Sequence, residues 1–312
     1  MKVSDVLTSE EVKYFTERSD RRGAWVVAVN WLSIAAVFTA VALWTNPVTL
    51  LLAILLLGGR QMGLAVLMHE AGHKTLFKSQ ALNENIGQWL CAYPVLGDCD
   101  AYGTSHREHH RTAGTDADPD LPNYQNYPVE RDSFLRKIKR DITGQTGVKL
   151  LGGLVSGGSR SIMMREGEKS TAVRQGLLVN LGLFTVLLMA GVPELYLLWI
   201  IAYLTAYPLI ARIRQVAEHG NVPGLFDLDP RLNTRTTIPR WFERPFFCPN
   251  GVNFHVEHHL LASVPCYKLR ELHECLRARG FYDGYEHTLA YGYWDVIKRA
   301  VPDFDKSHPA TA

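Results

Sequence analysis

Residues 253–259 read NFHVEHH, and two related stretches come before them, HEAGH at residues 69–73 and HREHH at residues 106–110. Residues three and four positions apart lie on one face of a helix, so each stretch would present its imidazoles together. Neutral imidazole is a common ligand for transition metals. Three such stretches in one chain predict a metal site. Its expected ligands are His69, His73, His106, His109, His110, His255, His258 and His259.

The composition argues against several other classes of protein. The chain has 312 residues and a net charge of only +2, so bulk charge predicts no nucleic-acid partner. Its five cysteines are odd in number and form no CxxC pair, which argues against a disulfide framework and against a zinc ribbon. This length suffices for one large domain, which we expect to comprise residues 1–312.

Long apolar segments alternate with polar segments along the chain. A helix of about 20 apolar residues can cross the ~30 Å hydrocarbon layer of a membrane. Turns at residues 46–47 and 192–194 would join the apolar segments in pairs. The sequence therefore predicts an all-α integral membrane protein with two helical hairpins and a helical cap. The four membrane spans are expected at residues 24–45, 48–68, 176–191 and 195–211, and the cap at residues 69–174 and 212–312.

The distribution of basic residues predicts the orientation in the membrane. The two turns contain no Lys or Arg, whereas the polar segments at the opposite ends of the spans are rich in both. Basic segments stay on the cytoplasmic side of a membrane. We therefore expect both termini and the metal site in the cytoplasm, with the spans in a bacterial inner membrane.

Two of the spans continue directly into polar sequence that carries histidine. HEAGH follows the second span without a break, and residues 212–220, which read RIRQVAEHG, follow the fourth. His219 is therefore a ninth candidate ligand, with Gln215 one turn earlier on the same face. One zinc ion needs three or four ligands, so nine histidines suffice for two metal ions with open positions. Two such irons could reduce oxygen and attack an unactivated C–H bond of a lipid chain.

The three histidine stretches, the sequence RTAGTDADPD after the second, and the two hairpins resemble the membrane fatty acid desaturase and hydroxylase superfamily. The resemblance covers residues 24–276. It implies two Fe ions held by the histidines, O2 as the oxidant and two external electrons. A separate ferredoxin or small haem protein with its reductase would supply the electrons. The resemblance also implies that His219 is a ligand, and that the amide of Gln215, in place of the usual Asn, could hold a metal-bound water.

Several further residues are expected to support the metal site or the substrate. Acidic residues in or after the histidine stretches would hydrogen-bond ligating imidazoles or nearby arginines and so orient the ligands. They are Glu70, Glu108, Glu257, Asp116 and Asp118. On the second span, Met62, Ala65 and Val66 share the helix face of His69. These three side chains would line the substrate channel, with core packing as the alternative.

The ligand pattern allows more than one activity. We predict that the protein introduces a double bond into a fatty acyl chain of a lipid, with no catalytic side chain beyond the metal centre. A lipid or carotenoid hydroxylase would use the same diiron site. HEAGH also fits the HExxH signature of a zinc protease, with Glu70 as the general base, and an iron-binding or transport protein is a further alternative. The basic stretch at residues 131–174 would contact either an acidic electron donor or anionic lipid.

Overall fold

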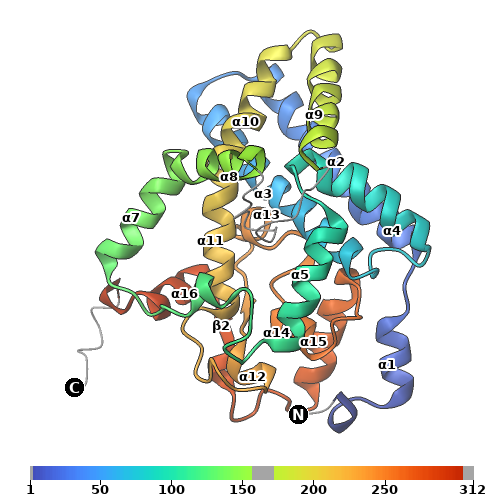
Figure 1. The fold of residues 1–312 in the computed structure, drawn as a ribbon, viewed down its shortest axis with the longest axis vertical. Helices are drawn as coiled ribbons and strands as arrows, with labels where there is room; N and C mark the ends of the chain where they lie inside the picture. The colour runs from blue at the N-terminus through green and yellow to red at the C-terminus, as the bar shows by residue number, and fades with distance from the viewer. Residues whose placement is uncertain (1–2, 157–171, 305–312) are drawn as a thin grey trace.

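The longest helices of the protein are formed by its apolar segments. The computed structural model describes residues 3–156 and 172–304. Two helix pairs dominate its upper part, and they are joined by turns at the positions that the sequence predicts (Figure 1). The first pair is α2 (Asp20–Leu43) and α3 (Pro47–Gly72). The second pair comprises α9 (Ala172–Met189), η4 (Pro193–Leu195), α10 (Tyr196–Leu204) and α11 (Ala206–His219).

Shorter elements form the remainder of the described chain. Before and between the helix pairs lie η1 (Val3–Asp5), α1 (Ser9–Thr16), α4 (Gln80–Ile86), η2 (Gly87–Ala92), η3 (Tyr93–Val95), α5 (Cys99–Thr112), α6 (Leu121–Tyr124), α7 (Arg131–Ile142) and α8 (Gln145–Ser156). After them come α12 (Pro230–Asn233), β1 (Thr236–Ile238), α13 (Arg244–Phe247), η5 (Pro249–Gly251), α14 (His255–Leu260), η6 (Cys266–Lys268), α15 (Leu269–Ala278), η7 (Glu286–Thr288), β2 (Leu289–Tyr291), α16 (Tyr293–Ala300) and η8 (Pro302–Phe304).

The protein is mostly helical, as predicted, with one small exception among the described residues. Strands β1 and β2 pair in parallel over three residues each, with Thr236 opposite Leu289. Two short strands from distant parts of the cap hold its C-terminal segment against the segment that precedes α14. A contact of this kind depends on tertiary packing, because three-residue strands carry no periodicity that a sequence could reveal.

Three stretches are long and apolar enough to cross a membrane by length and composition: Asp20–Leu43, Pro47–Gly72 and Pro193–His219. The predicted span at residues 176–191 falls on a shorter apolar stretch, Val173–Met189. At 1.5 Å per residue this helix measures about 25 Å, less than the ~30 Å hydrocarbon layer. The described residues therefore contain three candidate spans, and a fourth complete crossing stays a prediction.

The predicted span at residues 195–211 is interrupted. Thr205, with φ −121° and ψ −70°, separates α10 from α11. Pro208 explains the break, because its nitrogen carries no hydrogen to bond the carbonyl of Leu204 and its ring clashes with that carbonyl. The polar residues after Ala211 nevertheless continue α11 as far as His219, as the sequence predicts.

Helix α3 lies at the centre of the membrane-facing part, where it contacts α2, α10 and α11. Small residues let these helices approach closely. A Cβ atom on Gly58 would lie 2.5 Å from the Cβ of Ala206, and one on Gly63 would lie 2.2 Å from Oδ1 of Asn30. Asn30 in turn donates from Nδ2 to the backbone oxygen of Arg60. The glycines of α3 therefore determine how tightly the spans pack.

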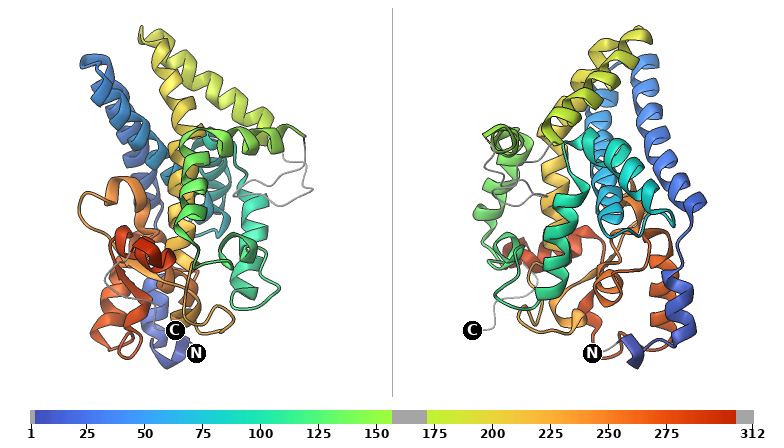
Figure 2. Two further views of the ribbon diagram at one scale, coloured as in Figure 1. Left: turned by 90° about the vertical axis from the view of Figure 1, so that its left-hand side faces the viewer. Right: turned by 45° about the vertical axis from the view of Figure 1, so that its right-hand side comes forward.

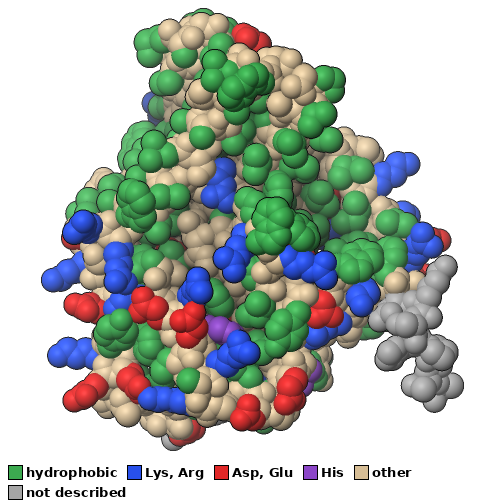
Figure 3. Space-filling view, turned by 180° about the vertical axis from the view of Figure 1, so that it is seen from behind, with side chains coloured by type: hydrophobic (Ala, Val, Ile, Leu, Met, Phe, Trp, Pro, Cys, Tyr) green, Lys and Arg blue, Asp and Glu red, His purple; other side chains and the backbone are tan. Residues whose placement is uncertain are grey.

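The two ends of the molecule differ in chemistry. The turns of both helix pairs lie at one end, and α1, α12 and α15 lie at the other (Figures 1 and 2). Apolar side chains cover the upper part of the face in Figure 3, whereas Lys, Arg, Asp and Glu gather over the lower part. Large apolar side chains on the spans, including Leu51, Leu181 and Leu197, are exposed. This division fits a membrane-embedded half and a polar cap, and the predicted cytoplasmic side of that cap stays a prediction.

Replacing Gly58 with Val should destabilise the protein, because the added carbons would collide with Ala206 and force α3 away from α11. Overpacking of this kind costs roughly 1–3 kcal/mol. We expect a lower midpoint of thermal unfolding in detergent. Gly182→Val on α9 is the matched control, since a Cβ there meets nothing within 4 Å. Equal midpoints for the two variants would contradict this packing.

Candidate metal centre

Four helix ends bring the nine predicted histidines together. His69 lies in the last turn of α3, His73 caps that helix, and His219 is the last residue of α11. The remaining six come from α5 and α14. Their possible ligand atoms form two groups, in each of which all atoms lie within 4.8 Å of one another. The five-histidine group is His69, His73, His106, His110 and His258, and the four-histidine group is His109, His219, His255 and His259.

The distances within the five-histidine group fit one metal ion. The Nε2 atom of His69 lies 2.9 Å from Nε2 of His106 and 3.0 Å from Nε2 of His258. Nε2 of His110 lies 3.1 Å and 2.9 Å from the same two atoms. Two nitrogens that each lie about 2.1 Å from one ion, at right angles, are about 3.0 Å apart. The group therefore has the dimensions of a coordination shell.

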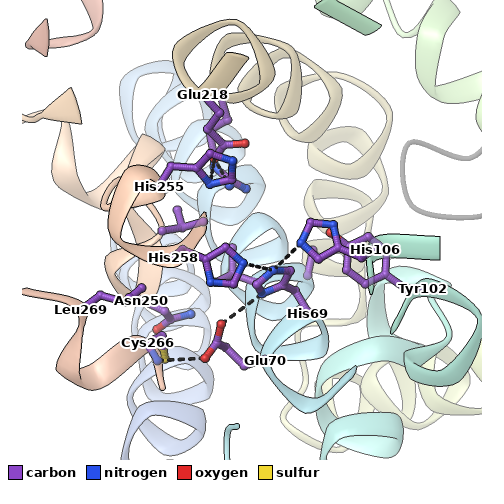
Figure 4. Close-up of a pocket in the computed structure, with 14 residues that line it drawn as sticks. His69, Glu70, Tyr102, His106, Glu218, Asn250, His255, His258, Cys266 and Leu269 are labelled. Atoms are coloured by element: carbon purple, nitrogen blue, oxygen red, sulfur yellow. Dashed lines mark hydrogen bonds and ion pairs between the residues drawn. The ribbon is translucent and has the colours of Figure 1, made fainter. Parts of the chain in front are cut away.

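Hydrogen bonds among these nitrogens do not account for the whole cluster. Nδ1 of His69 lies 3.0 Å from Oε1 of Glu70 and therefore carries the proton, which leaves Nε2 with a bare lone pair (Figure 4). That lone pair faces Nε2 of both His106 and His258. Nε2 of His73 is buried and has no hydrogen-bond partner among the described residues. Buried polar atoms of native proteins normally have partners, and a cation between them would satisfy this whole set.

The four-histidine group shows the same arrangement. His219 Nδ1 donates to the backbone oxygen of Asn233 over 3.0 Å, so its bare Nε2 faces Nε2 of His255 at 2.9 Å. His109 Nδ1 lies 2.8 Å from Oδ1 of Asp118, and its Nε2 lies 3.3 Å from Nε2 of His259. Partners that hold the far ring nitrogen fix the tautomer of a metal-binding histidine. The chain thus provides two sites that can each hold a metal ion.

Burial keeps most of these imidazoles in the form that binds metal. It lowers the pKa of His73, His106, His110, His255, His258 and His259 well below the usual value. They are therefore neutral at neutral pH and can act as ligands. Burial also acts to lower the pKa of His109, but the hydrogen bond to Asp118 and the nearby carboxylate charges outweigh it and raise that pKa.

The predicted acidic partners have different positions. Glu70 contacts His69, and its other oxygen accepts from the hydroxyl of Thr75 and from the backbone nitrogen of Cys266. Asp118 contacts His109, as described above. Glu108 instead forms an ion pair with Arg111, and Asp116 is exposed. These two residues do not share the buried environment of Glu70 and Asp118.

Glu257 supports the centre indirectly. The sequence predicts that it hydrogen-bonds a ligating imidazole or a nearby arginine, but its partners are other residues. Its carboxylate contacts His273 Nδ1, the hydroxyl of Tyr282 and the hydroxyl of Thr236. His273 belongs to neither histidine group. Glu257 therefore ties α14 to α15 and β1. The helix that carries the third histidine stretch is held in place through this carboxylate, whereas Glu70 and Asp118 hold imidazoles directly.

Sequence reasoning missed a buried ion pair beside the four-histidine group. Arg214 and Glu218 pair one turn apart on α11, and an oxygen of Glu218 lies 3.9 Å from Nδ1 of His255. The predicted span ends at Ala211, which assigns both charges to ordinary polar sequence. Opposite charges four residues apart, next to His219, were the signal that could have revealed them. Tyr124, which stacks on His219 and donates to Asp118, had no such signal.

A small cavity of about 50 Å³ adjoins the histidines (Figure 4). Ala65 and Val66 line it. Met62 is not a lining residue, and its sulfur lies 3.0 Å from a guanidinium nitrogen of Arg214. Arg214 and Glu218 are the lining residues from α11. The substrate channel along Met62, Ala65 and Val66 and the water contact of Gln215 remain predictions. The other lining residues are His69, Glu70, Tyr102, His106, Asn250, Val252, His255, His258, Cys266 and Leu269.

Two comparisons with known proteins each match most of the chain. A family model described as fatty acid desaturase matches residues 45–293. The chain is also 30% identical over 288 residues to a dihydrorhizobitoxine desaturase of Bradyrhizobium elkanii, which corresponds to 86% of this chain and 78% of that protein. The family match includes all three histidine stretches and His219.

Removing the carboxylate of Asp118 should weaken metal binding. Without it, the ring of His109 loses the partner that fixes its proton and its orientation. Losses of this kind typically reduce metal affinity 10–100-fold. If each histidine group holds one metal ion, the Asp118→Ala protein should lose about one of the two ions per chain on dialysis against a chelator, measured by atomic absorption. Asp116→Ala, which changes a nearby exposed carboxylate, is the control. Equal metal loss from both proteins would contradict the role of Asp118 in orienting His109.

Arg214→Met should destabilise the protein more than the double change Arg214→Met with Glu218→Gln. The single change leaves the largely buried carboxylate of Glu218 without its cation, and losing one partner of a buried pair typically costs about 3–5 kcal/mol. Thermal unfolding of the purified variants in detergent would measure the order. If the second substitution lowered the midpoint further, the pair would not be a mutually neutralised unit.

Proposed function

This protein belongs to the fatty acid desaturase family, and from that membership we propose that it is an O2-dependent oxidoreductase that introduces a double bond into a fatty acyl chain of a lipid. One observation carries the proposal. Two groups of imidazoles, most of them kept neutral by burial, adjoin a cavity lined by residues of a candidate membrane span, and each group has the dimensions of one coordination shell. The family is known for a diiron centre, and the nine histidines are suited to hold it.

Bound at the two histidine groups, a pair of irons would supply the oxidising power that removes hydrogen from an unactivated methylene. The chain's own residues do the remaining work. Glu70, Asp118 and the carbonyl of Asn233 hold protons on the outer ring nitrogens and so aim the inner nitrogens at the centre. Ala65 and Val66 present apolar surface to a substrate that approaches along α3. Enclosure of the cavity by the surrounding helix ends limits the access of water.

A hydroxylase remains the alternative reaction with the same ligands, since the outcome depends on how the substrate lies in the site. Desaturation is favoured by the relative, which is named as a desaturase. That relative is named for dihydrorhizobitoxine and not for a fatty acid. The charged pair Arg214–Glu218 in the cavity wall is the observation that favours a second candidate, desaturation of a substrate with a polar group near the reacting carbon.

The protease alternative finds little support in the geometry. His69 and His73 share their group with three further histidines, whereas a zinc protease needs open access to its HExxH pair. Glu70 would be the general base of such an enzyme. Its oxygens already contact His69, Thr75 and the backbone of Cys266, which leaves it poorly placed to accept a proton from water.

Lipid mass spectrometry tests the reaction directly. Cells that express this chain should contain acyl species two hydrogens lighter than those of cells that express His258→Ala, because His258 belongs to the five-histidine group. A species heavier by one oxygen would indicate hydroxylation. The water-soluble fraction of the same cells tests the second candidate substrate. Identical profiles in both fractions would oppose the proposed function.

A further inference from the structure

Two large apolar side chains are exposed at the polar end of the molecule. Phe226 is 62% exposed and Leu228 is 71% exposed. They flank the exposed Asp227 in the loop between α11 and α12, and α12 lies at the end opposite the turns of the helix pairs (Figure 1). We call residues 226–228 the 226–228 patch. The bilayer predicted around the spans would not cover it, because the patch lies on the other side of the metal centre.

The 226–228 patch is connected to a predicted metal ligand by two hydrogen bonds. The backbone oxygen of Asp227 accepts from Nδ2 of Asn233 over 2.8 Å. The backbone oxygen of Asn233 accepts from Nδ1 of His219 over 3.0 Å. His219 belongs to the four-histidine group. A short route of covalent and hydrogen bonds therefore leads from the exposed loop to the centre.

Backbone contacts hold this loop in a defined shape. The nitrogen of Asp227 donates to Gly224, whose own nitrogen donates to Leu232. Gly114, with φ +85°, packs so closely that a Cβ atom there would lie 2.1 Å from the oxygen of Asp227. Because these contacts fix the backbone, Phe226 and Leu228 are held at the surface. A preformed apolar surface loses little entropy when a partner binds to it.

The electron balance of the proposed reaction requires a partner. Forming a C=C bond from two methylenes releases two electrons and two protons. Reducing O2 to two water molecules consumes four electrons and four protons. Two electrons must therefore come from a donor, with two protons from water. This need rests on the proposed function, because a protein without oxygen chemistry would not require it.

We propose that the 226–228 patch is the docking surface for a small soluble electron-transfer protein that carries an iron–sulfur cluster or a haem. Weak redox complexes have small interfaces, and two apolar side chains can form the centre of such a contact. Electrons would then enter through the four-histidine group. The patch contains one charge, Asp227, so docking there should depend little on ionic strength. Docking on the basic helix α7 would weaken steeply with salt.

Stopped-flow reduction of the oxidised, iron-loaded protein tests the docking surface without a substrate. A reduced plant-type [2Fe–2S] ferredoxin and a reduced small b-type cytochrome serve as probes, and the faster of the two is used. We expect the double variant Phe226→Ser with Leu228→Ser to lower the second-order rate constant about tenfold or more, the loss of a ~1.4 kcal/mol contact. Each single variant should show part of that loss.

Two controls make the result specific. Dithionite needs no docking surface and should reduce the double variant at the wild-type rate, with iron content unchanged. Arg136→Ser with Lys139→Ser, at exposed positions of α7, should leave protein-driven reduction unchanged. The proposal is overturned if the patch variant is reduced by the donor at the wild-type rate, if it loses iron, or if the α7 variant carries the loss. Product formation by dithionite-reduced protein with O2 and a lipid extract tests the proposed function separately.

Discussion

Bare imidazole lone pairs directed at two small volumes are the constraint on which the rest of the structure depends. Lone pairs about 3 Å apart repel one another, so a cation between them would stabilise the meeting of the ends of α3, α5, α11 and α14. The carboxylates and carbonyl that hold the outer ring nitrogens make this arrangement specific, because they remove the alternative tautomers. Metal binding and the packing of the cap are therefore coupled, as in other proteins whose ligands come from distant segments.

The membrane-facing helices and the metal centre are parts of one continuous scaffold. Helix α3 carries Gly58 where it meets α11, and its C-terminal end carries His69 and His73, so the packing of the spans determines where these ligands lie. Helix α11 restarts after Thr205 and reaches His219 through the buried pair of Arg214 and Glu218. A change in the approach of the two helices would move ligands of both groups at once.

Under the proposed function, the two ends of the molecule have separate tasks. Apolar spans bring a substrate to the cavity beside Ala65 and Val66, whereas the polar end brings electrons to the four-histidine group. This separation has a physical advantage. A hydrophobic chain and a soluble protein never compete for one surface, and both can be bound while O2 reacts. The charged pair Arg214–Glu218 in the cavity wall favours a substrate with a polar group near the reacting carbon.

Local spacing by itself determined the nine candidate ligands, the helical class and the continuation of the spans into the histidine stretches, because helical periodicity and hydrophobic length act within a short segment. Only the tertiary structure decided how the ligands divide. His106 and His110 join the five-histidine group, whereas His109 joins the four-histidine group. On α14, His258 joins the first group, whereas His255 and His259 join the second. The crossing of helices directs adjacent rings to different centres.

For the same reason only the fold paired Glu257 with His273, brought Arg214 and Glu218 to the cavity, and left Asp116 exposed while burying Asp118. Those pairings join residues whose distance in space no periodicity records.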